Sequence, residues 1–177
     1  MALATGFIQI ERLAEDELVT AIDAAFTAES AGIFAGVTLP YVFKGYDQTT
    51  ANTIPHVSIL CCKVEPSTQD LREMIYDVEI DIVIRSSMRK DKDKADINLY
   101  SSFIRYILAD PNLAANLNAQ SDGNAYVKTP SIASGDLTFQ RMRIKPESAV
   151  STLSTTKTNY EITHKMHCII SLDYSEV

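Results

Sequence analysis

The segment 76–85 constrains the fold of this chain most, because apolar residues occupy every second position and Asp77, Glu79 and Asp81 fall between them. Alternate residues of a β-strand point to opposite faces, so the pattern predicts a strand with one apolar and one acidic face. A charged turn, an amphipathic helical pattern and two further strand-like runs follow. The order strand, helix, strand, strand predicts an α+β fold, in which two main helices pack on an antiparallel, or mixed, sheet of four or more strands.

The length and composition predict one globular domain that spans residues 1–177. A chain of 177 residues is long enough for one core, and 46% hydrophobic with 22% charged residues is ordinary for a folded domain. The net charge is −7, which disfavours a general attraction to nucleic acid because phosphate binding needs a concentrated basic surface. A local basic patch stays possible.

The cysteines and the amino terminus bear on the compartment. Cys61, Cys62 and Cys168 are an odd set, and buried free thiols in a reducing compartment explain them most simply. The amino terminus has no basic start, and the chain has no run of eighteen apolar residues. We therefore expect a cytosolic protein that is neither secreted nor membrane-spanning.

Three elements are expected in the first half besides the acidic strand. Helical spacing of apolar residues predicts a helix over 10–28, and a short strand is expected over 41–43. The run 56–64 is apolar on both alternating sets, which is typical of a strand buried on both faces, and Pro66 is expected to end it. The short connection to 76–85 predicts antiparallel pairing.

The second helix is expected to begin at Asp93 or Asp96, since either carboxylate can cap free amides, and to lie across the buried side of the sheet. Asp110 and Pro111 predict that a new turn of helix begins after the second helix ends. The polar segment 118–136 is expected to be a loop.

Two strands are expected to close the chain. The run 137–145 reads as a strand whose alternation slips between Phe139 and Met142, which indicates a bulge. The Ser- and Thr-rich segment 146–158 is expected to be an extended, mobile connection. The segment 160–172 alternates throughout and is expected to be the longest strand.

A metal site is the first chemistry to weigh, because His164, His167 and Cys168 are close in sequence and Cys61 and Cys62 are adjacent. On strands, however, His164 and His167 point to opposite faces, as do the two adjacent cysteines. No ligand spacing typical of zinc occurs. Ordinary packing is therefore favoured, and no metal or other cofactor is expected.

The acidic strand offers a second possibility. Asp77, Glu79 and Asp81 have a spacing that suits paired catalytic carboxylates or a hard cation. The exposed face of a half-buried strand is nevertheless where charge belongs, so a solvated or subunit-facing surface is favoured. Arg85, Lys63 or a neighbouring chain is expected to offset the repulsion between these like charges.

Other catalytic patterns are absent from the sequence. It contains no nucleophile elbow and no glycine-rich nucleotide loop, so we expect no enzymatic activity. Arg141, Arg143 and Lys145 alternate along one strand. They could contact a phosphate backbone, but pairing with the acidic strand of this chain or of a neighbouring subunit is favoured.

The chain resembles the tail-terminator, or tail-completion, proteins of long-tailed bacteriophages and related minor tail and neck subunits. The segments that carry the resemblance are YDVEIDIVIRSS (76–87), ADINLYSSFIRYILADPNLAANL (95–117), LTFQRMRIKP (137–146) and YEITHKMHCIISL (160–172). The resemblance implies subunits that close into a ring, typically hexameric, on the head-proximal end of the tail tube. The ring would stop tube growth and dock the head's connector in a virion assembled in the host cytoplasm.

The expected partners are further copies of the chain, the tail tube protein, the head–tail connector or head-closure protein, and DNA that passes through the channel without sequence-specific binding. A subset of carboxylates is expected to line that channel, where negative charge keeps DNA from sticking. A head-closure, connector or other tube subunit is the main alternative, and a small ligand-binding domain or enzyme is a further one. The residues expected at an interface or channel are Asp77, Glu79, Asp81, Arg85, Arg89, Lys90, Arg141 and Arg143.

Overall fold

The computed structural model describes residues 9–45, 54–66, 75–87, 92–113 and 159–170, together with the backbone of 7–8, 67–69, 73–74, 91, 127–128, 137–155 and 171–176. Its centre is one five-stranded sheet with the strand order β2-β3-β4-β7-β6. The first strand pairs parallel to its neighbour and the other pairs are antiparallel, so the sheet is mixed. The strands are β2 (Tyr41–Lys44), β3 (His56–Gln69), β4 (Glu73–Ser87), β7 (Asn159–Glu176) and β6 (Leu137–Thr155).

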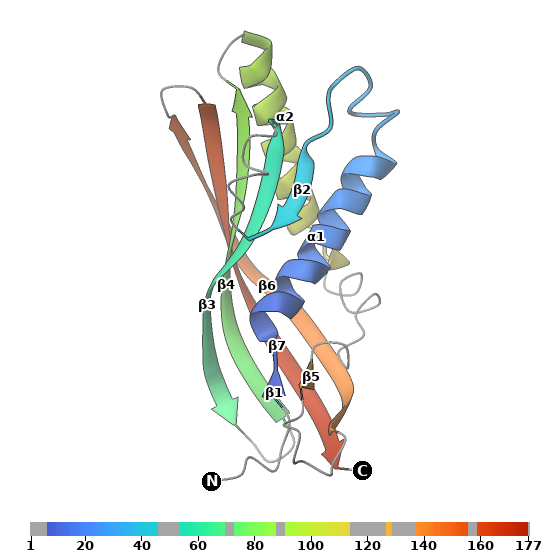
Figure 1. The fold of residues 1–177 in the computed structure, drawn as a ribbon, viewed down its shortest axis with the longest axis vertical. Helices are drawn as coiled ribbons and strands as arrows, with labels where there is room; N and C mark the ends of the chain where they lie inside the picture. The colour runs from blue at the N-terminus through green and yellow to red at the C-terminus, as the bar shows by residue number, and fades with distance from the viewer. Residues whose placement is uncertain are drawn as a thin grey trace.

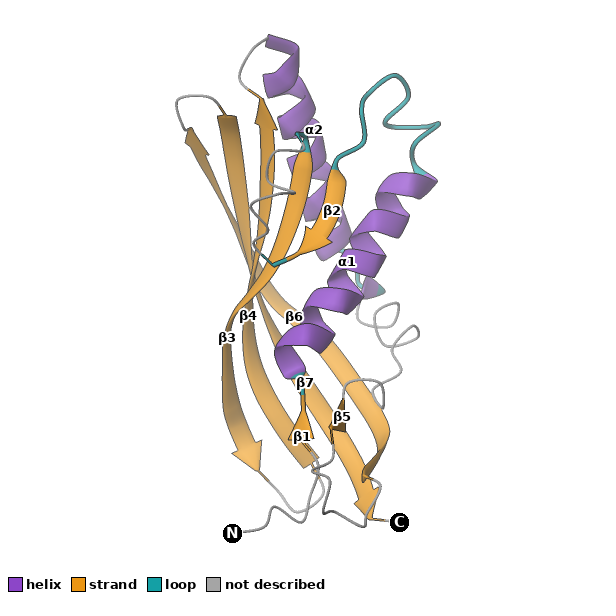
Figure 2. Cartoon of the chain, in the orientation of Figure 1, coloured by secondary structure: helices purple, strands orange, loops and turns teal. Residues whose placement is uncertain are grey.

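Two helices, α1 (Ile10–Ala28) and α2 (Asp91–Leu108), complete the expected α+β fold. Both contribute to one hydrophobic core with the sheet, so they cover the same face (Figure 1). Figure 2 shows the long strands crossing at mid-height and fanning out at both ends, as expected for a twisted sheet. A small second sheet, which the sequence did not predict, pairs β1 (Phe7–Ile8) with β5 (Val127–Lys128).

The alternation in β4 is confirmed. Val78, Ile80, Ile82 and Ile84 are at most 1% exposed, so they form the floor of the core beneath the helices. The residues between them point to the opposite face of the sheet. One strand therefore supplies both the core and a charged surface.

Aromatic residues join the helices to each other and to the turn after α1. The ring of Phe26 lies 5.1 Å from that of Phe34 and 5.2 Å from that of Phe103, measured between centroids. Tyr100 is buried and its hydroxyl donates to the carbonyl oxygen of Thr38 at 2.6 Å. The turn that follows α1 is thus part of the core.

The prediction for β3 was wrong in two respects. The strand continues through Pro66 to Gln69, with a register shift next to the proline. Both alternating sets are buried only at the start of the strand, where His56 and Ser58 are enclosed as well as Val57 and Ile59, whereas Leu60 is exposed. The physical reason is that both helices cover one face only, so the second apolar set faces outward.

The expected mobile connection over 146–158 was also wrong, because β6 continues to Thr155. Pro146 lies next to a register shift at the edge of the sheet, where a missing amide removes no necessary ladder bond. The predicted bulge is confirmed by a register shift between Phe139 and Arg141. With 19 residues, β6 exceeds the 18 of β7, so β7 is not the longest strand.

The second helix begins at Asp91, ahead of both predicted starts. Asp93 accepts a hydrogen bond from the hydroxyl of Ser87, at the end of β4. The predicted new turn after the helix is confirmed, since the Asp110 carboxylate accepts the Asn112 amide proton at 2.8 Å. Within the expected loop 118–136, the described residues are those of β5.

Candidate interaction surface on the open face of the sheet

The face of the sheet opposite the helices, called the open face below, carries the acidic residues of β4. Asp77, Glu79 and Asp81 lie there with side chains 40%, 56% and 25% exposed. They are held in a row because the buried isoleucines between them fix the strand's orientation. The acidic stripe predicted from the sequence is therefore a surface feature.

Basic residues of the two neighbouring strands lie opposite these carboxylates. Glu79 is directly paired with Lys63 of β3, and a carboxylate oxygen lies 3.7 Å from the lysine nitrogen. Asp81 is paired with Lys165 of β7, with 3.9 Å between the charged atoms. Lys63 thus offsets the acidic row as expected, and β7 supplies a second cation.

His167 extends the row of charged residues at the end where Asp77 lies. Its Nε2 atom lies 3.7 Å from a carboxylate oxygen of Asp77, and the pair is ionic only when the imidazole is protonated. The open face therefore alternates acidic and basic groups across three strands, β3, β4 and β7. Exposed pairs of this kind add little stability but give a surface directional charge.

Arg85 makes the closest ion pair of the described part of the open face. Its Nε atom donates to Glu161 of β7 at 2.6 Å, and the two residues are direct cross-strand partners. Both side chains are less than a quarter exposed, at 23% and 22%. A close ion pair therefore joins Arg85 of β4 to β7.

The remaining predicted interface residues are placed in part. Arg89 and Lys90 lie outside the described residues. Arg141 and Arg143 are backbone partners of Asp173 and Ser171 on β7. Because cross-strand partners share a face, this register places both arginines on the open face.

On the covered face, one polar pair joins α2 to β7. The Ser101 hydroxyl lies 3.1 Å from Nε2 of His164, whose side chain is completely buried. Burial, and secondarily the positive charge of Arg105, lowers the pKa of His164 to about 4. The imidazole is therefore neutral at physiological pH, and it lies on the opposite face of β7 from His167, as predicted.

The cysteines are unsuited to nucleophilic chemistry. Burial raises the pKa of both Cys61 and Cys168 to about 12, so their thiols stay protonated at neutral pH. Cys62 is exposed, which contradicts the expectation of a buried thiol. Among the residues with described positions, no three His, Cys, Asp or Glu side chains converge in a way that could hold a metal ion.

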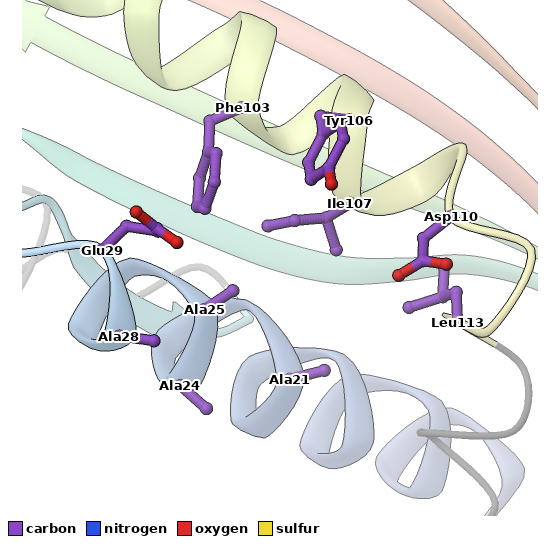
Figure 3. A pocket seen from close by; sticks show the side chains of 10 residues that line it. All are labelled: Ala21, Ala24, Ala25, Ala28, Glu29, Phe103, Tyr106, Ile107, Asp110 and Leu113. Carbon is purple, nitrogen blue, oxygen red and sulfur yellow. The ribbon is translucent and has the colours of Figure 1, made fainter. Parts of the chain in front are cut away.

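A shallow groove of about 360 Å³ lies between the two helices, away from the open face (Figure 3). Figure 3 shows the Glu29 and Asp110 carboxylates at opposite ends of it and the Tyr106 ring along one side. Small and apolar side chains make up the rest of its lining: Ala21, Ala24, Ala25, Ala28, Phe103, Ile107 and Leu113. The groove suits an apolar group with positive charge at its ends, and it brings no nucleophile and base together.

Some of these features could have been anticipated. Glu161, Lys165 and His167 alternate along one predicted strand, which indicates that they share a face. Their pairing with particular carboxylates depends on the register between β4 and β7, which the sequence does not specify. The groove depends on the separation of two helices and has no signal beyond the alanines of α1.

Comparison with known proteins gives no family. A scan against models of protein families and a search of curated proteins each found no match. In the part of the chain that the structure describes, no helix is both long and apolar enough to cross a membrane.

Proposed function

We propose that this chain is a structural subunit of a bacteriophage tail or neck, which assembles into a hexameric ring that caps the tail tube and docks the head connector. The proposal rests on the resemblance of the segments 76–87, 95–117, 137–146 and 160–172 to tail-terminator proteins. The fold that this resemblance implies, helices on one face of a largely antiparallel sheet, is the fold of the chain. In this role the protein makes and breaks no covalent bond.

The observation that carries the proposal is the open face. A sheet covered on one side by both helices leaves a broad second side, and here that side carries acidic and basic groups from three strands. Subunits of a ring need surfaces that recognise one neighbour in one orientation, and fixed rows of opposite charge provide this. We assign the open face to contacts with neighbouring subunits or with the tube.

Electron microscopy of the purified chain mixed with terminator-free tail tubes tests the proposal. A ring is expected on one end only, and tube growth is expected to stop. Charge reversal of the open face by Glu79→Lys together with Lys165→Glu is expected to reduce capping at least about tenfold, because charged interface groups are matched to one partner. The matched control is Asp23→Lys, which changes an exposed carboxylate on α1. Uncapped tubes with the wild-type chain would contradict the proposal.

The channel for DNA is part of the same proposal. Carboxylates that line it would repel the phosphate backbone and let DNA slide. Particles in which channel-facing carboxylates are replaced by lysine are expected to eject DNA more slowly. Unchanged ejection rates would remove the channel role and leave the carboxylates to subunit contacts.

The groove between the helices favours a second candidate, a small ligand-binding domain. Its apolar lining and terminal carboxylates suit a cationic amphiphile. A thermal-shift titration with a short alkyl diamine tests this candidate. A saturable rise in Tm that Ala25→Phe abolishes would favour ligand binding, whereas no shift would exclude this class of ligand.

A further inference from the structure

The two edges of the sheet differ in how they are protected against pairing with another strand. A bare edge presents unpaired amides and carbonyls, and natural proteins blunt it with charge, proline, bulges or short strands. At one edge, β2 has only four residues. Past the end of β2, β3 is itself the edge strand, and there it carries Lys63, Glu65 and Pro66 with two register shifts. At the other edge, the first half of β6 carries Arg141, Arg143, Lys145 and Pro146. These stretches are protected.

The second half of β6, residues 148–155, lacks all of these protections. Its sequence is SAVSTLST, with no charge, no proline and no glycine, and no register shift interrupts it. Its described backbone pairs with β7 on one side, and β6 ends the sheet on the other. In Figure 1 this end of β6, drawn in brown, stands at the upper left, across the sheet from β2. We call residues 148–155 the uncharged edge.

We propose that the uncharged edge pairs antiparallel with the uncharged edge of a second copy of this chain, which joins two sheets into one across a twofold axis. A second copy fits this segment, because pairing of the two uncharged edges brings no charged side chain of the segment against the other. Pairing with the other described edges would bring Lys63, Glu65 or Pro66 against it. Hydroxyl side chains facing each other across strands also favour the contact.

The register with β7 decides which residues meet across the axis. Val150 and Thr152 are partners of Lys165 and Thr163, which places them on the open face, whereas Ser151 is the partner of the buried His164. A twofold axis between antiparallel strands is perpendicular to the sheet, so open-face residues of one copy meet open-face residues of the other. When the axis passes near the middle of the uncharged edge, Thr152 lies opposite Thr152 of the second copy or diagonal to it.

This geometry gives a charge test at one position. Sedimentation equilibrium of the full chain without tail tubes, at several concentrations, is expected to show a dimer. Thr152→Lys, and separately Thr152→Glu, is expected to raise the dissociation constant about fivefold, because like charges then meet across the axis. An equimolar mixture of the two variants is expected to restore dimers, and this rescue shows that both variants are folded.

Thr163→Lys is the matched control, because Thr163 is the partner of Thr152 on the interior strand β7 and points to the same face. It is expected to leave the dimer unchanged. A wild-type chain that stays monomeric at every concentration would overturn the proposal, as would association that Thr152→Lys leaves intact. The inference does not depend on the proposed function, because capping of tubes is measured separately.

Discussion

The two faces of the sheet are made by the same strands and serve different ends. On the covered face, isoleucine and valine side chains of β4 pack under the helices, and the polar pair His164 and Ser101 is fully enclosed. On the open face, most of the residues between them carry charge and are partly exposed. The covered face therefore contributes most of the folding free energy, whereas the open face carries the charged groups that can recognise a partner. Substitutions of equal size should have very different effects on the two faces.

The largest difference is expected from Ile82→Ala, which empties a completely buried position in the centre of β4. The free energy of unfolding should fall by about 3–4 kcal/mol, from lost burial and the cavity left behind. Val83→Ala, on the open face of the same strand, should cost about 1 kcal/mol or less. Urea unfolding of both variants measures the difference, and equal losses would break the distinction between the faces.

The enclosed His164 should make the covered face sensitive to acid. Its pKa of about 4 in the folded chain lies below the ordinary histidine value of 6.5, so the unfolded chain binds a proton first as pH falls. The neutral imidazole's contribution to the free energy of unfolding is fully present above about pH 6.5. As pH falls toward 4, the free energy of unfolding should decrease by about 3 kcal/mol.

His164→Gln keeps a group that can hydrogen bond to Ser101 and does not titrate. The difference between the wild-type and variant free energies of unfolding, measured from pH 7.5 to pH 4, isolates this contribution from that of the carboxylates. The gap in favour of the wild type should shrink as pH falls. A constant gap would show that His164 does not control the acid response.

An intermediate effect is expected for Arg85→Met, which leaves the partly buried Glu161 without its closest cation. The loss should be about 2 kcal/mol, because a charge-assisted hydrogen bond with restricted solvent access is broken. Glu161→Gln and the double variant complete a cycle that gives the coupling energy of the pair. A coupling energy near zero would mean that this pair adds no more stability than the exposed ion pairs of the open face.

The smallest effect is expected for Glu79→Gln. Its pair with Lys63 is about half exposed on both sides, at 56% and 45%. The free energy of unfolding should change by less than about 0.5 kcal/mol, and less still in high salt. Urea unfolding in low and high salt checks this, and a loss above 1 kcal/mol would mean that the open face contributes to folding after all.

Sequence patterns predicted the elements best where one face is buried. The alternation in 76–85 and the helical spacing in 10–28 correspond to β4 and α1, since burial on a single face imposes a strict period. The patterns failed in the Ser- and Thr-rich half of β6 and beyond Pro66. There a strand is held by backbone pairing with a neighbour, which leaves no hydrophobic period to read.

By itself, the sequence determined the α+β class, the two helices, the division of β4 into apolar and acidic faces, and the acidic residues of the candidate surface. Only the tertiary structure decided the strand order, the parallel pairing of β2, the partners of each carboxylate and the groove between the helices. The reason is that periodicity is local, whereas register and neighbours depend on residues far apart in the chain. Lys63, Glu161 and Lys165 lie 16, 76 and 84 positions from Glu79, Arg85 and Asp81, and strand pairing alone brings them together.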